Sequence, residues 1–160
     1  MRLKIAAIGK LKDDEERAMC ARYQKRFDGA GKALGLGPLD IQEFSESRLS
    51  SSDARKADEA QRLLKCAADA AFKIVLDEKG QSLSSEAFAA LLARHRDAGA
   101  KHCALLIGGP DGHGPDMLAA ATVRLSLGAM TLPHGLARVV LTEQIYRAAT
   151  ILAGHPYHRA

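Results

Sequence analysis

The feature that most constrains the fold is a regular alternation between short apolar runs and longer segments with helical periodicity. Apolar runs that predict strands occupy residues 3–8, 39–44, 72–76, 102–107 and 123–127. Helices are predicted over residues 13–27, 51–71, 84–96 and 135–153, with only a short helical piece after Pro115. Several of the strands are uniformly apolar, which is typical of strands buried on both faces. We therefore expect an α/β fold, with a mainly parallel sheet and helices on both faces.

Length and composition favour one globular domain that spans residues 1–160. A chain of 160 residues buries a sizeable core but is too short for several domains. The net charge of +4, from 23 basic and 19 acidic side chains, is too balanced for a histone-like chain, yet it permits a partner that carries phosphate. With no Trp, four Phe and three Tyr, an aromatic platform for stacking bases is not expected.

The cysteines and the N-terminus indicate a cytoplasmic protein. Cys20, Cys66 and Cys103 are far apart and form no Cys-x-x-Cys pair, so neither a zinc site nor a redox disulfide is expected. The first twelve residues contain an apolar run too short for a signal peptide, and no apolar stretch approaches eighteen residues. We expect neither export nor a membrane span.

The loops after the third, fourth and fifth predicted strands are the candidate ligand site, because ligands of parallel sheets bind beyond the carboxyl ends of the strands. These loops are residues 77–81, 108–115 and 128–133. Loop 108–115 is rich in glycine but matches no dinucleotide or phosphate-loop motif. Its Gly108 and Gly109 either let the backbone approach a ligand or simply form a tight turn. Segment 127–134 is small and apolar, which suits either the flat face of an adenine or a buried connection.

The last residues, His155-Pro156-Tyr157-His158-Arg159, can hydrogen-bond, stack and pair with phosphate, whereas chain ends are usually bland. Their alternative interpretation is a solvated tail. No further metal ligand adjoins the two histidines, so zinc is not expected. Arg22, Lys25 and Arg26 share a face of the first predicted helix and are interpreted as a solvated surface.

Four segments resemble one known family in sequence and in order. They are LLIGGP at 105–110, LSL at 125–127 continuing to MTLPH at 130–134, EQIYRA at 143–148 and PYHR at 156–159. The chain resembles the ribosomal RNA large subunit methyltransferase H family, the small SPOUT enzymes that methylate N3 of a pseudouridine in 23S rRNA. The similarity extends from the first predicted strand to the last residues, and the lengths agree.

The resemblance implies a deep trefoil knot at the C-terminal end of the sheet, against the general rarity of knots. It also implies S-adenosylmethionine as methyl donor, no metal, and a homodimer. Cofactor contacts carried over by position are Leu76, Gly108, Gly109, Leu127, Gly128, Ala129, Met130, Thr131 and Leu132. The predicted helix 135–153 supports the dimer independently, because it carries apolar side chains around much of its circumference. These are Leu136, Val139, Val140, Ile145, Ile151 and Leu152.

The implied reaction is an in-line methyl transfer to N3 of pseudouridine, with ribosomal RNA inside the assembled ribosome as the expected partner. His155, His158 or solvent would remove the imide proton, and Tyr157 would position the base. Arg147 and Arg159 suit a phosphate or a carbonyl oxygen. The alternatives are a non-catalytic RNA-binding module with the same fold and an α/β hydrolase. The hydrolase requires a G-x-S-x-G motif, and the chain has none.

Overall fold

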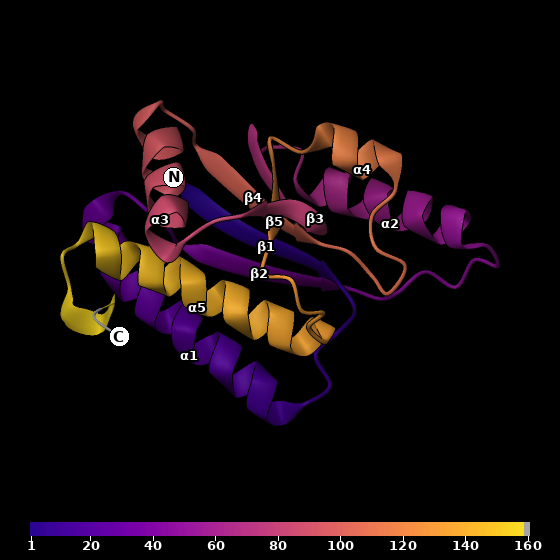
Figure 1. Ribbon diagram of the computed structural model, residues 1–160, viewed down its shortest axis with the longest axis horizontal. Helices are drawn as coiled ribbons and strands as arrows, with labels where there is room; N and C mark the ends of the chain where they lie inside the picture. The colour runs from indigo at the N-terminus through magenta and orange to yellow at the C-terminus, as the bar shows by residue number, and fades with distance from the viewer. Residues whose placement is uncertain (159–160) are drawn as a thin grey trace.

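A twisted parallel sheet lies at the centre of the protein, and the computed structural model describes residues 1–158 (Figure 1). In chain order the elements are β1 (Arg2–Ile8), α1 (Asp14–Gly31), β2 (Leu39–Phe44), α2 (Ser52–Cys66), β3 (Phe72–Ser82), α3 (Ser85–Asp97), β4 (His102–Ile107), α4 (Pro115–Ala120), β5 (Val123–Ser126) and α5 (His134–Leu152). Short 3₁₀ turns occupy Lys32–Leu34 and Pro156–His158.

The strand order in the described part of the chain is β2-β1-β4-β3-β5, and each neighbouring pair is parallel. Helices α1, α3 and α5 cover one face of this sheet, and α2 and α4 cover the other (Figure 1). The predicted α/β fold with helices on both faces is confirmed. None of the helices within residues 1–158 is long and apolar enough to cross a membrane.

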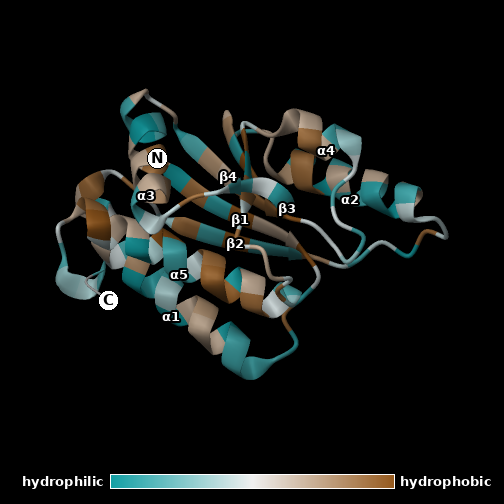
Figure 2. Cartoon of the chain, in the orientation of Figure 1, coloured by the Kyte–Doolittle hydropathy of each residue, from teal (hydrophilic) through white to brown (hydrophobic). Residues whose placement is uncertain are grey.

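The uniformly apolar strands are explained by two separate cores, one on each face of the sheet. Along β1, Leu3 and Ile5 point into the larger core with α1, α3 and α5, whereas Ala6 and Ile8 point into the smaller core with α2 and α4. All four side chains are at most 1% exposed. Figure 2 shows the resulting pattern, with hydrophobic segments in the central strands and hydrophilic ones on the outer turns of α1 and α2.

Two helices end elsewhere than predicted. Helix α1 starts where Asp13 accepts the backbone N–H groups of Glu15 and Glu16, both at 2.9 Å, and it continues through Gly31 rather than ending at residue 27. A β-carbon at Gly31 would lie 2.6 Å from the carbonyl oxygen of Leu36, so the glycine permits close packing instead of a loose loop. Helix α2 ends at Cys66, before its predicted end at residue 71.

Strand β3 is longer than predicted because its polar second half wraps around β5. Leu125 of β5 is paired with both Leu76 and Gln81, so the intervening residues bulge out and then rejoin the sheet. A β-carbon at Gly80 would lie 2.7 Å from the carbonyl carbon and oxygen of Arg124, which shows that the two backbones cross in direct contact. The apolar pattern ends at Leu76 and therefore misses this crossing.

Candidate functional site

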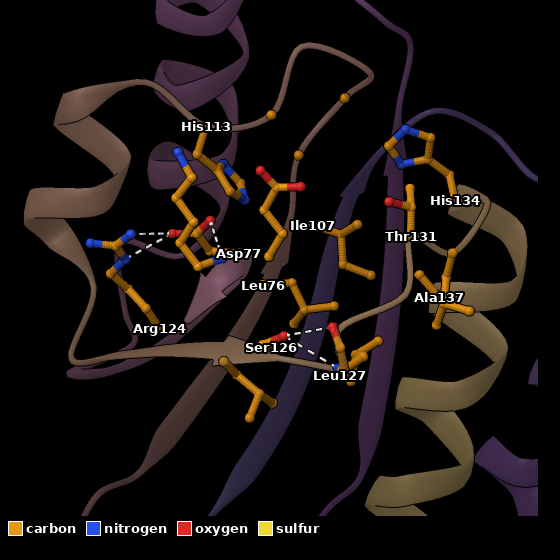
Figure 3. A pocket seen from close by; sticks show the side chains of 18 of the residues that line it. Leu76, Asp77, Ile107, His113, Arg124, Ser126, Leu127, Thr131, His134 and Ala137 are labelled. Carbon is orange, nitrogen blue, oxygen red and sulfur yellow. Dashed lines mark hydrogen bonds and ion pairs between the residues drawn. The ribbon is translucent and has the colours of Figure 1, made fainter. Parts of the chain in front are cut away.

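A cavity of about 480 Å³ lies beyond the carboxyl ends of β3, β4 and β5, where the loop analysis predicts a ligand site (Figure 3). Its walls are the polar part of β3, loop 108–113, segment 124–132 and the first turn of α5. This volume falls within the usual range of small-molecule sites, about 300–1,000 Å³. The three predicted loops thus meet at one cavity.

The residues predicted to contact the cofactor all line this cavity. They are Leu76, Gly108, Gly109, Leu127, Gly128, Ala129, Met130, Thr131 and Leu132. Residues 128–131 are exposed, and Gly128 has φ +133°, a conformation that residues with a side chain rarely adopt. Ser126 holds the turn, because its hydroxyl accepts the N–H of Gly128 at 3.2 Å and donates to its carbonyl at 3.0 Å.

The glycine pair at the end of β4 is packed too closely for side chains. A β-carbon at Gly108 would lie 3.0 Å from the His113 ring, and one at Gly109 would lie 2.7 Å from a carboxylate oxygen of Glu59. The carbonyl of Gly109 also accepts the N–H of Gly112 at 2.9 Å, which closes a tight turn. The interpretation of the glycines as a tight turn is therefore confirmed, and their backbone also lines the cavity.

Glu59 supports this loop from behind, although no sequence pattern indicates it. Its side chain lies on α2, is 4% exposed and accepts the backbone N–H of Ser47 at 2.9 Å. Arg55 on the same helix forms a two-point ion pair with Asp111, with distances of 2.6 and 3.1 Å. Helix α2 therefore fixes loop 108–114 at two places.

The charged end of the cavity was also missed by the sequence analysis. Arg124 of β5 contacts Asp77 of β3 through Nε, at 2.8 Å, and through Nη2 (Figure 3). Burial raises the pKa of Asp77, but hydrogen bonds from the Lys79 backbone and from Arg124 outweigh it, so that the net pKa is below its usual value. Burial lowers the pKa of His113 beside them, although the Asp77 charge acts in the opposite direction. At neutral pH this end presents an ion pair and a neutral imidazole.

The predicted catalytic residues gather in a second place, at the C-terminal end of α5. Glu143 accepts hydrogen bonds from Arg147, at 2.9 Å, and from the Tyr157 hydroxyl, at 3.0 Å. The Arg147 guanidinium lies 5.0 Å from the centre of the Tyr157 ring. Hydrogen bonding to Glu143 raises the pKa of Arg147, so this side chain keeps its charge.

All three tyrosines of the chain belong to this cluster. Tyr146 lies 4.7 Å from Tyr157 and 6.1 Å from Tyr23, ring centre to ring centre. Arg22 and Arg26 of α1 lie 5.6 and 5.9 Å from the Tyr23 ring centre. The fold thus gathers the few tyrosines at one place, and these two arginines lie against the cluster. Both arginines are exposed, as predicted for a solvated face, and their contact with the tyrosines was not predicted.

The two histidines of the tail differ in their hydrogen bonds. Nδ1 of His155 accepts the backbone N–H of Tyr157 at 3.1 Å. Nδ1 of His158 lies 3.3 Å from the carbonyl oxygen of His155, and since a carbonyl only accepts, this nitrogen carries the proton. A neutral His158 therefore keeps its Nε2 lone pair free, whereas a neutral His155 does not. Arg159 lies outside the described residues.

The tail cluster and the cavity lie near opposite ends of α5. Ala137 lines the cavity and Arg147 belongs to the tail cluster, and ten residues of helix at about 1.5 Å each separate them by about 15 Å. The predicted catalytic and cofactor residues are thus not brought together within one copy of the chain.

Comparison with known proteins identifies the family. A family model described as "Predicted SPOUT methyltransferase" matches residues 1–158. The ribosomal RNA large subunit methyltransferase H of Rhodopseudomonas palustris strain TIE-1 is 51% identical over 160 residues, covering all of both chains. That of Rhizobium leguminosarum bv. trifolii strain WSM2304 is 48% identical over 99% of both. The chain belongs to the ribosomal RNA large subunit methyltransferase H family. The resemblance seen in its motifs is confirmed.

A solved structure shares the fold of this chain. A probable methylase family protein from Haemophilus influenzae Rd KW20 superposes with a TM-score of 0.58 at 12% identity, covering 97% of this chain and 69% of that one. At so low an identity the similarity concerns the fold alone. For a member of a SPOUT methyltransferase family, the cavity at the carboxyl ends of β3, β4 and β5 is the natural candidate for the methyl donor.

Proposed function

We propose that this protein transfers a methyl group from S-adenosylmethionine to N3 of a pseudouridine in 23S rRNA, acting in the cytoplasm on the assembled ribosome. The observation that carries the proposal is the coincidence of full-length 51% identity to a large-subunit rRNA methyltransferase with a cavity formed by the nine predicted cofactor residues. Bound S-adenosylmethionine supplies an electrophilic methyl group on a sulfonium.

The cavity fits this cofactor by its shape and its chemistry. Its walls near Gly108 and in segment 127–132 consist of backbone and uncharged, mostly apolar side chains, which suits main-chain hydrogen bonds to a flat adenine. Its other end carries the ion pair of Asp77 and Arg124, which suits the zwitterionic amino-acid head group. No metal is part of the proposal.

Threading of the chain supports the knot that the family implies. Within β3, residues 77–80 bulge out of register, lie against the β5 backbone at the Gly80 crossing, and are followed by Gln81 and Ser82, which pair with β5 again beside Leu125. After β5 the chain continues through segment 127–133 to α5, on the sheet face opposite α4. We propose that this crossing belongs to a trefoil knot and that the knot fixes the three cavity loops relative to one another.

A two-fold dimer would supply what one copy lacks. The tail cluster is about 15 Å along α5 from the cavity, so we propose that the tail of one protomer reaches the cavity of its partner. Two large apolar side chains near the cavity are available for such a contact, since Met130 is 84% exposed and Leu136 is 45% exposed. Of the six apolar residues noted on this helix, Val139 and Ile145 pack within the protomer.

Within the tail, the hydrogen bonds favour His158 as the proton acceptor. Its free Nε2 lone pair can take the imide proton, whereas Nδ1 of His155 is occupied by the Tyr157 N–H. Burial and the hydrogen bonds of Tyr157 raise its pKa, so its hydroxyl positions and does not act as a base. The permanent charge of Arg147 suits a phosphate or the uracil carbonyl oxygen.

The function is tested by methyl transfer to ribosomes that lack the modification. Purified protein with S-adenosylmethionine is incubated with whole ribosomes, isolated large subunits or naked 23S rRNA, and nucleosides are analysed by mass spectrometry. N3-methylpseudouridine should form with whole ribosomes and fall in the other two samples. No methylated nucleoside with any of the three would refute the proposal.

The composite site is tested by mixing two inactive variants. Gly108→Val disables the cavity, because a β-carbon there already approaches His113 to 3.0 Å, and truncation after Pro156 removes the tail. Unfolded and refolded together, the two variants should regain about a quarter of wild-type activity, because half of the dimers are mixed and each then has one intact site of two. Complete inactivity of a mixture shown to contain mixed dimers would place both halves of the site in one protomer.

A further inference from the structure

At the charged end of the cavity, the ion pair of Arg124 and Asp77 is held in a fixed orientation, unlike a typical ion pair on the protein surface. Arg124 and Asp77 come from different strands, yet Nε and Nη2 of the arginine both contact the same carboxylate oxygen, Oδ2. The other oxygen, Oδ1, accepts the backbone N–H of Lys79 at 3.1 Å. The Asp77 side chain is only 15% exposed, so the carboxylate is fixed from two sides and in turn fixes the guanidinium.

This arrangement leaves most of the guanidinium available. Of its five N–H groups, Asp77 uses one on Nε and one on Nη2, and in the described part of the chain Arg124 makes side-chain hydrogen bonds only to Asp77. Arg124 lines the cavity and its side chain is 42% exposed. An oriented, charged donor group therefore borders the space in which the proposed cofactor lies.

We propose that Arg124, held by Asp77, binds the α-carboxylate of the methionyl group of S-adenosylmethionine. The inference rests on the proposed function and deepens it by assigning one end of the cofactor. A guanidinium matches a carboxylate because two parallel N–H groups can meet two oxygens. The opposite wall, segment 127–132, carries no charged side chain, so the adenine lies there and the amino-acid head group lies toward Arg124.

Lys79 is the other permanent cation that lines the cavity, and it provides a matched control. It is exposed, and it contributes its backbone N–H to Asp77 rather than its ammonium group. If only the general positive potential mattered, the loss of either cation would weaken binding alike. If a directed contact matters, only Arg124 is sensitive.

The test uses calorimetry with three ligands that differ at the head group. S-adenosylhomocysteine has both the ammonium and the carboxylate, 5′-deoxy-5′-(3-aminopropylthio)adenosine lacks the carboxylate, and 5′-methylthioadenosine lacks both. Arg124→Gln should weaken S-adenosylhomocysteine about tenfold, the low end for a charge-assisted contact because the side chain is partly exposed. The same variant should leave the other two affinities unchanged. Arg124→Lys should fall between, and Lys79→Gln should bind all three ligands like the wild type.

Several results would overturn the inference. If Arg124→Gln lowered the affinity for all three ligands equally, the role of Arg124 would be structural, to hold the β3 bulge in place through Asp77. Thermal unfolding of the variant would then show a loss of stability. Unchanged affinity for S-adenosylhomocysteine, with weaker binding to ribosomes, would assign Arg124 to rRNA phosphate. If the wild-type protein bound none of the three ligands, the proposed function itself would fall, and this inference with it.

Discussion

Gly80→Ala tests the backbone crossing on which the threading argument depends. A β-carbon at this position would lie 2.7 Å from the carbonyl carbon and oxygen of Arg124 and 2.8 Å from the carbonyl carbon of Leu125. These are backbone atoms of a paired strand, so no side-chain rotation relieves the overlap, and β3 must move away from β5. Overpacking of this kind costs about 1–3 kcal/mol, and the rigid neighbours place the expected loss in the upper half of that range.

The magnitude translates into a measurable shift. For a chain of this size 1 kcal/mol corresponds to about 2–4 °C, so Gly80→Ala should lower the Tm by about 4–12 °C. Gly29→Ala is the matched control, because Gly29 lies in helix α1 and a β-carbon there would meet nothing within 4 Å beyond its own stretch of helix. Alanine at that exposed helical position should raise stability by about 0.4–1 kcal/mol.

The assay is urea denaturation followed by circular dichroism, at one protein concentration because dimerisation would otherwise shift the midpoint. A lower midpoint at an unchanged slope shows a loss of stability rather than a change of unfolded state. If Gly80→Ala proved as stable as the wild type while Gly29→Ala gained stability as expected, the two backbones would not cross in contact. The main structural support for a threaded chain would then be lost.

Three further predictions concern single side chains. Arg138→Met should cost about 1–3 kcal/mol, because it removes the ion pair with the partly exposed Glu43 and leaves the Gly9 carbonyl without its donor, and the double variant with Glu43→Gln should recover part of this in urea denaturation. Burial lowers the pKa of His113 in the folded state below its value of about 6.5 in the unfolded chain. The stability that the neutral imidazole contributes is therefore complete above about pH 6.5 and is lost as the pH falls through the folded-state pKa. His113→Gln should flatten the pH dependence of Tm between about pH 7.5 and 5. His158→Gln should lower kcat about a hundredfold, whereas an equal effect of His155→Gln would contradict the tautomer argument.

Local sequence pattern predicted the strands and the place of the cavity. The apolar runs at 72–76 and 102–107 are found as buried parallel strands, because a strand covered on both faces must be apolar throughout. The cavity followed from the same reasoning, since the carboxyl ends of parallel strands meet at one edge. Loop composition already singled out Gly108, Gly109 and segment 127–134, and the family resemblance added Leu76 and the identity of the expected ligand.

Contacts between distant, individually ordinary residues could not be predicted. Arg138 is 1% exposed and pairs with Glu43, ninety-five positions away, and also donates to the carbonyl of Gly9 at 2.9 Å. Neither charged residue stands out in its own segment, because a charged residue on a helix or an edge strand is usually solvated. The tyrosine cluster was missed for the same reason: a count of aromatics says nothing of where the fold places them.

In the proposed dimer, helix α5 would set the distance between the two halves of the composite site. Its first turn borders the cavity through His134 and Ala137, and its last turns carry Arg147. Between them Arg138 ties the helix to β2 and to the residue that follows β1, so the helix is held rigidly and cannot bend its two ends together. A rigid helix keeps the cofactor site and the tail cluster of one protomer at a constant separation. If two-fold symmetry then places the tail of one protomer at the cavity of its partner, it also places the partner's tail at the first protomer's cavity. Methyl transfer, which depends on holding nitrogen, carbon and sulfur in line, would gain from that fixed spacing.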